Sequence, residues 1–91
     1  MALMLMGFEV DNYDEWKQLF DSDPVGRKSM AKGHRISRSI DNPNEFYLSV
    51  EYASADDART VLARLHDAGV FQRFQPTLGP KITEITEETT Y

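Results

Sequence analysis

The sequence predicts an α+β domain in which two helices cover one face of a four-stranded antiparallel sheet. Three observations predict this class: a short apolar run of strand length near the start, two segments that open with helix-capping residues and continue with helical periodicity, and a turn-rich stretch between two strand-like segments. The 91 residues suit one domain spanning residues 1–91. A chain of this length buries only about 60 to 65 per cent of its unfolded surface, so we expect a thin core.

Composition and charge exclude several classes of protein. With 41% hydrophobic and 27% charged residues, the chain is expected to be globular rather than disordered or fibrous. It has no cysteine, which excludes disulfide bonds and thiolate-ligated zinc. The net charge of −5, without a dense Lys and Arg cluster, argues against a nucleic acid partner. No segment has the features of a membrane span or an export signal, so we expect a cytoplasmic protein with no membrane partner.

Local signals mark the first strand and the first helix. Leu3–Val10 is an apolar run too short for a stable helix, which favours a strand. Asn12 is followed three residues later by Glu15, and this spacing is typical of a capping box at the start of a helix. Within that helix, aromatic residues recur at helical spacing and form one stripe that we expect to face the core: Tyr13, Trp16 and Phe20.

A second helix start follows closely, because Pro24 after Asp23 suits the first position of a helix. We therefore expect the first helix to be broken in two. The second piece is predicted to end near Lys32, where Gly33 takes the left-handed conformation that closes a helix. The next strand is predicted to span His34–Asp41.

The segment Asp41–Asn44 is rich in turn-forming residues and leads into a second strand at Glu45–Tyr52, which predicts a β-hairpin. A register with Ile36 opposite Val50 gives one mainly apolar face and one polar face. The apolar face then pairs Arg38 with Leu48, Ile40 with Phe46 and His34 with Tyr52. The polar face pairs Arg35 with Glu51, Ser37 with Ser49 and Ser39 with Tyr47.

The last third of the chain contains the second helix and the fourth strand. Ser54 is a helix-capping residue and Gly69 a stop signal, which predicts a helix over Ala55–Ala68. A loop follows that carries two phenylalanines and two prolines, and the fourth strand is predicted at Lys81–Glu87.

Right-handed crossovers place both helices of a βαββαβ chain on the same face of the sheet, which is the ferredoxin-like arrangement. The opposite face, expected to carry Ser37, Ser39, Tyr47 and Ser49, is left without a cover in a single copy. A second copy of the chain commonly fills such a gap. We therefore expect a homodimer that pairs through the open sheet face.

Four segments resemble one family. They are NYDEWKQLFDSDP in the first helix, GHR at the entry to the second strand, VEYASADDAR between the third strand and the second helix, and DAGV after that helix. They are similar to the dimeric α+β barrel superfamily, which contains antibiotic-biosynthesis-monooxygenase-like and small cyclase-like proteins. The resemblance implies a dimer with a shared barrel, a small-molecule cleft between helices and sheet, and monooxygenase or cyclase chemistry without a cofactor. Haem-degrading members use an asparagine, tryptophan and histidine set that this sequence does not reproduce, since its first strand has no asparagine.

Several side chains are candidates for a site in that cleft. His34 is the one candidate for a catalytic residue, since imidazole is neutral or charged near pH 7, although a strand-end histidine bonded to backbone is the simpler interpretation. The predicted ligand-binding set is Trp16, Phe20, His34, Arg38 and Tyr52. The aromatic stripe is more simply explained as core, and Arg38 is equally explained as a side chain that reaches solvent. With His34 and His66 isolated, no metal site is expected.

The leading functional hypothesis is a protein that binds a small aromatic or polyketide-like molecule in the cleft between helices and sheet. One alternative is a non-catalytic dimerisation or partner-binding module, in which the loop from Val70 to Leu78 presents Phe71 and Phe74. Another is an RNA-recognition domain, which shares the βαββαβ order. That hypothesis is disfavoured because Ser49 stands where the second stacking aromatic is needed and Glu45 where a basic residue is needed.

Overall fold

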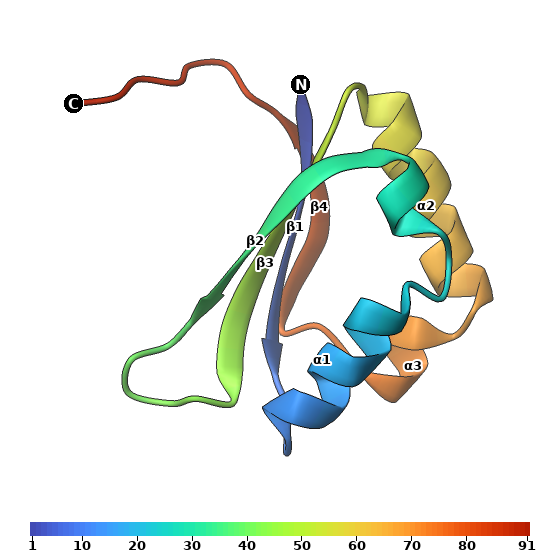
Figure 1. The fold of residues 1–91 in the computed structure, drawn as a ribbon, viewed down its shortest axis with the longest axis vertical. Coiled ribbons are helices and arrows are strands. Elements are labelled where there is room, and N and C mark those ends of the chain that lie inside the picture. Colours follow the sequence, from blue (N-terminus) through green and yellow to red (C-terminus); the bar gives the residue numbers. More distant parts are fainter.

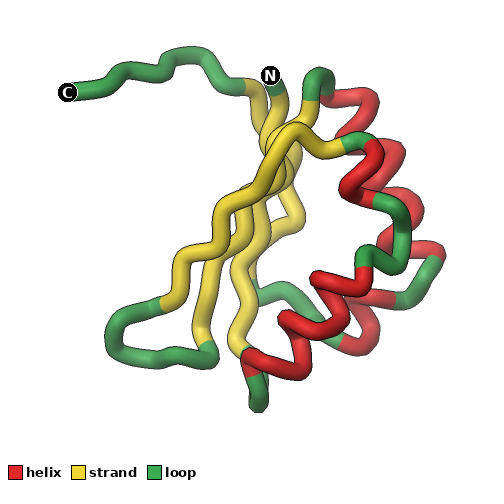
Figure 2. Tube along the Cα trace, in the orientation of Figure 1, coloured by secondary structure: helices red, strands yellow, loops and turns green.

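The computed structural model describes residues 1–91 and has the predicted order of elements. These are β1 (Ala2–Glu9), α1 (Tyr13–Ser22), a 3₁₀ turn (Arg27–Ser29), β2 (Ala31–Arg38), β3 (Glu45–Tyr52), α2 (Ala55–Asp67), α3 (Val70–Arg73) and β4 (Leu78–Glu84). The strands form one antiparallel sheet in the order β2-β3-β1-β4. All helices lie on one face of it (Figure 1; Figure 2). The predicted α+β, ferredoxin-like fold is confirmed. None of the helices combines the length and the hydropathy that crossing a membrane requires.

Asn12 begins α1 as predicted, because its side-chain oxygen accepts hydrogen bonds from the amides of Asp14 and Glu15 at 3.0 and 3.3 Å. The reciprocal half of the predicted capping box is not formed. The Glu15 carboxylate instead lies 3.4 Å from the guanidinium of Arg73, at the end of α3. The cap is therefore a one-sided amide cap, and Glu15 joins two helices.

The prediction that a second helical piece reaches Lys32 and ends at Gly33 is wrong. Asp23 adopts the left-handed conformation (φ 55°) and closes α1, and Gly26 is also left-handed (φ 71°). Two such residues three positions apart turn the chain back sharply, so only the 3₁₀ turn forms before β2 begins at Ala31. Gly33 lies inside β2, where the strand has a bulge.

The predicted hairpin forms, but its register is shifted by two residues. His34 lies opposite Val50 and Ile36 opposite Leu48, and β2 ends at Arg38 instead of Asp41. The loop is longer than predicted because the Ser39 hydroxyl oxygen accepts hydrogen bonds from the amides of Asp41 and Asn42, both at 3.2 Å. Side-chain direction repeats every two residues, so a two-residue shift leaves each strand residue on its predicted face. Ser39 and Ile40 are the exceptions, since both lie in the loop after β2, and Ile40 is fully exposed.

The second helix is confirmed, with the Ser54 hydroxyl accepting a hydrogen bond from the Asp57 amide at 3.2 Å and a left-handed Gly69 just after it. The segment that follows is more ordered than predicted. It begins with the short helix α3, and β4 starts at Leu78 instead of Lys81 and ends at Glu84 instead of Glu87. Phe71 and Phe74 are half-buried against the core, so this segment does not project them.

The core lies between the sheet and the helices and is built around Phe46, which is completely buried. The ring centroid of Phe46 lies 4.3 Å from that of Trp16, 5.2 Å from Tyr13 and 5.3 Å from Phe8. Aromatic contacts of this kind stabilise a fold beyond the area that they bury. They attach α1 to the middle of the sheet.

We expect Asn12→Ala to lower the free energy of unfolding by about 1 kcal/mol, because two amides at the start of α1 lose their acceptor. Denaturant unfolding followed by circular dichroism measures the change. The matched control is Gln18→Ala, an exposed position on the same helix, which should stay within about 0.5 kcal/mol of the parent. Equal effects of the two substitutions would contradict the role given to Asn12.

Candidate functional site

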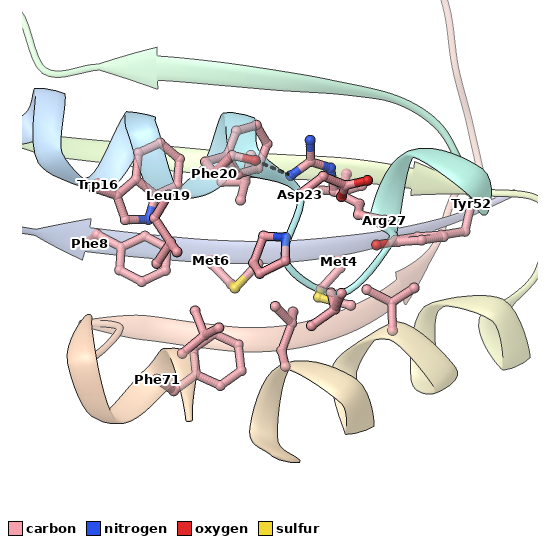
Figure 3. A pocket seen from close by; sticks show the side chains of 17 residues that line it. Met4, Met6, Phe8, Trp16, Leu19, Phe20, Asp23, Arg27, Tyr52 and Phe71 are labelled. Carbon is pink, nitrogen blue, oxygen red and sulfur yellow. Dashed lines mark hydrogen bonds between the residues drawn. The ribbon is translucent and has the colours of Figure 1, made fainter. Parts of the chain in front are cut away.

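A small cavity of about 50 Å³ lies between the helices and the sheet (Figure 3). Fourteen of its 17 lining residues are hydrophobic, so its walls favour an apolar occupant. The sheet contributes Met4, Met6, Phe8, Leu48, Val50 and Tyr52. The helices and the turn contribute Trp16, Leu19, Phe20, Asp23, Pro24, Val25, Arg27, Val61, Leu65, Val70 and Phe71.

The polar groups of this lining are Asp23, Arg27 and the hydroxyl of Tyr52, and they come from the turn after α1 and from the end of β3. In Figure 3 these three residues stand toward one end of the cavity, while Phe8 and Phe71 stand toward the other. The cavity therefore has an apolar end and a polar end. Such an arrangement can orient a molecule that has one polar group.

Arg27 is the most unusual side chain of the site, since only 7% of its surface is exposed. Its Nη1 donates to the Phe20 carbonyl oxygen at 3.2 Å, and its guanidinium carbon lies 3.6 Å from the centroid of the Phe20 ring. Its Nη2 is buried without a hydrogen-bond partner. Burial lowers the pKa of Arg27, and the charge of Asp23 is the largest influence that opposes the shift. A guanidinium nevertheless stays protonated at neutral pH.

The chain folds tightly around Arg27. The left-handed Asp23 directs the backbone back toward α1, and its carboxylate accepts a hydrogen bond from the Lys28 amide, with the two oxygens 3.4 and 3.2 Å from the nitrogen. The 3₁₀ turn is closed by the Met30 amide, which donates to the Arg27 carbonyl at 3.0 Å. These backbone contacts place the Arg27 side chain against the ring of Phe20.

Tyr52 ends β3 and is completely buried. Burial raises the pKa of Tyr52 to about 12, although the positive charge of Arg27 opposes this shift. The phenol is therefore neutral at neutral pH and is able to donate a hydrogen bond. Figure 3 shows its oxygen pointing into the space between the helices and the sheet.

Three of the five residues predicted to bind a ligand line this cavity: Trp16, Phe20 and Tyr52. The other two, His34 and Arg38, do not. The guanidinium of Arg38 lies 3.9 Å above the ring of Tyr13, and its Nε donates to the Pro43 carbonyl at 3.0 Å near the hairpin loop. A ligand-binding role for these five residues stays a prediction.

His34 lies next to the cavity but outside its lining. Its ring meets the Phe20 ring edge-on, with centroids 4.9 Å apart, and its side chain is exposed. Burial of part of the ring and the nearby charge of Arg27 lower the pKa of His34. It forms no hydrogen bond with a carboxylate that would orient it as a base, and no three metal-ligating side chains come together anywhere in the chain.

Arg27 is the functional candidate that the sequence analysis missed. The Asp-Pro pair directed attention to a second helical piece, in which Arg27 carried no special role. No periodic pattern covers the turn. The burial of Arg27 follows from the return of the chain beneath Phe20, and neighbouring residues in the sequence do not signal it.

We expect the His34 imidazole to titrate below its ordinary pKa of about 6.5, which an NMR pH titration measures directly. The unfolded chain then binds more protons than the folded chain just below pH 6.5, so this histidine makes the fold less stable as the pH falls through that range. His34→Gln should reduce the loss of stability on acidification. A low pKa that persists in a His66→Gln control belongs to His34. A His34 pKa at or above 6.5 in the parent contradicts the expectation.

Comparisons with known proteins give a match at the level of fold. No protein-family model matches the sequence, and no curated protein matches it. Among solved structures, the chain is similar to one described as a "putative antibiotic biosynthesis monooxygenase" from Deinococcus radiodurans. The TM-score is 0.71, the match covers 100% of this chain and 98% of that one, and the sequences are 14% identical. The chain therefore has the fold of that protein, and the fold that the sequence resemblance implied is confirmed.

Proposed function

We propose that the chain binds a small, mainly apolar molecule in the cavity between its helices and its sheet. The observation that carries this proposal is the cavity itself, which is walled by aromatic and aliphatic side chains and has its polar groups at one end. Small-molecule sites in proteins usually combine these two features. The fold likeness adds support, because that structure is described as a "putative antibiotic biosynthesis monooxygenase".

The cavity must widen to admit a ligand, since small-molecule sites usually measure about 300–1,000 Å³. The wall made by α3 is the part best suited to move. This helix has four residues, Val70 and Phe71 are only half-buried, and its start is the left-handed Gly69. On the sheet side, Met4 and Met6 have flexible side chains that adapt to irregular shapes. A flat aromatic or polyketide-like molecule fits this description.

Any catalysis at this site would rest on placing the substrate and on hydrogen bonds from Arg27 and Tyr52. The fold likeness supports a monooxygenase as the enzyme class, and the resemblance of the sequence implies a cofactor-independent monooxygenase or cyclase. Such an enzyme needs a shaped apolar cavity that holds a reactive substrate in one conformation and excludes water.

The cavity is tested by Met6→Phe, which fills it from the sheet side. Small aromatic molecules such as indole should raise the melting temperature of the parent, because a ligand that binds only the folded state stabilises it by mass action. Met6→Phe should reduce this rise. Met30→Phe makes the same exchange at a half-buried position outside the cavity lining. It should leave the ligand-induced rise in melting temperature unchanged. Equal responses of the two variants would place the binding elsewhere.

We also propose that two copies of the chain pair through the sheet face that the helices leave open. Apolar side chains lie on this face beside the polar ones: Leu3 and Leu5 are half-buried, and Tyr47 and Leu78 are 47% and 51% exposed. Gly7 leaves room for the Tyr47 ring, since a Cβ atom there would come within 3.0 Å of it. A face with this composition suits a symmetric contact, which typically buries about 800 Å² of each partner.

Light scattering should therefore give a mass twice that of one chain. Tyr47→Lys should shift the protein toward a monomer, because a lysine at the centre of the contact would lose its hydration. The control is Tyr91→Lys, which alters an equally large tyrosine that is fully exposed in the C-terminal segment and should leave the mass unchanged. A parent that stays monomeric at high concentration would refute this proposal.

A further inference from the structure

We propose that, when two copies pair through their open sheet faces, the segment Ile85–Glu88 of each copy lies across the open face of the other. There the glutamates of the segment pair with Arg35 and Lys81. This inference rests on the proposed pairing of two copies and goes beyond it, because it names the segment and the side chains that hold the copies together. Tyr91 lies beyond the contact.

Two cations stand on the open face within one row of side chains. The strand pairings place this row from one edge of the sheet to the other, in the order Arg35, Ser49, Leu5 and Lys81. Arg35 belongs to β2 and Lys81 to β4, which are the two edge strands. Glu51, in the neighbouring row, forms no ion pair with either of them. Both cations are therefore without a carboxylate partner in a single copy.

The other cationic side chains show that this is exceptional. Seven of the ten lysines and arginines donate a hydrogen bond to a carboxylate or to a backbone carbonyl. The three that do not are Lys32, Arg35 and Lys81. A second copy that covers the open face removes water from Arg35 and Lys81. A buried charge without a partner is costly, so the covering copy is expected to bring carboxylates.

The segment after β4 is the part of the chain best suited to bring them. Residues 82–91 contain three glutamates and no lysine or arginine. These glutamates, Glu84, Glu87 and Glu88, are exposed and form no ion pair. The Ile85 amide donates to the Met1 carbonyl at 3.1 Å, and the residues after it form no backbone hydrogen bond. Figures 1 and 2 show the segment leaving β4 and running away from the helices, on the side of the sheet that they leave open.

Within one copy the two sets of charges do not meet. An open hollow of about 590 Å³ lies between them, with Arg35 on the side of the sheet and Glu87 and Glu88 on the side of the segment. An extended chain advances about 3.3 Å per residue and strands lie about 4.8 Å apart, so the stretch Glu84–Glu88 reaches about 13 Å along a row about 14 Å wide. In a symmetric pair each segment meets the row of the other copy, and the two contacts are identical.

Two charge-reversed variants test the contact by light scattering over a range of concentrations. Glu87→Lys with Glu88→Lys reverses the segment, and Arg35→Glu with Lys81→Glu reverses the row. Each variant alone should dimerise with a dissociation constant at least about tenfold higher than that of the parent, because like charges then meet at both contacts. All four positions are exposed, so both variants should keep the fold.

An equimolar mixture of the two variants separates a contact between copies from a contact within one chain. In a mixed dimer every segment meets a row of opposite charge, so the dissociation constant should return to within about threefold of the parent value. Both variants keep a negative formal charge, so a general attraction between oppositely charged proteins does not produce this recovery. The matched control is Asp14→Lys with Asp67→Lys, which makes the same change of charge at exposed helix positions and should dimerise like the parent.

Neutral variants give a second test without added repulsion. Glu87→Gln with Glu88→Gln and Arg35→Gln with Lys81→Gln should each weaken the dimer, and combining them should weaken it by less than the product of the two separate effects. Reversed variants that dimerise like the parent overturn the inference and leave the pairing of open faces intact. A mixture no tighter than either variant alone also overturns it, as do fully multiplicative effects of the neutral pairs. A parent that stays monomeric overturns the inference together with the proposed pairing.

Discussion

The contact between Trp16 and Phe46, with ring centroids 4.3 Å apart, fixes α1 on the sheet, and the candidate site depends on that placement. Trp16 and Phe20 lie on the same stripe of the helix, so the residues that attach α1 also form the wall of the cavity. The sequence left open whether this stripe is core or pocket lining. In the structure the stripe is both core and cavity lining, because the cavity is a gap within the core.

The parts of the fold that depend on neighbouring residues could be predicted from the sequence. The caps at Asn12 and Ser54 are made within three residues of the cap itself, and the stop at Gly69 is set by its own backbone conformation. The faces of the hairpin strands were also predictable, since alternation of side chains is a property of every strand. These local signals were sufficient for the order of elements and hence for the fold.

The parts that depend on distant contacts were not predictable in the same way. The hairpin register is set by hydrogen bonds to the Ser39 hydroxyl inside the loop, which no pattern of alternation reveals. The shift places His34 opposite Val50 and brings Arg38 to the hairpin end, where it contacts Pro43 instead of the cavity. Arg27 became buried because two left-handed residues return the chain beneath α1, whereas the sequence predicted a second helical piece there.

The position of the single tryptophan gives the protein an internal optical reporter. The Trp16 indole stacks on Phe20, whose ring also contacts the Arg27 guanidinium and the His34 ring, and it forms part of the cavity wall. Its emission should respond both to loss of the fold and to a molecule that replaces solvent or shifts the neighbouring rings. Because no second indole contributes a background, occupancy and unfolding can be followed on one chain without a label.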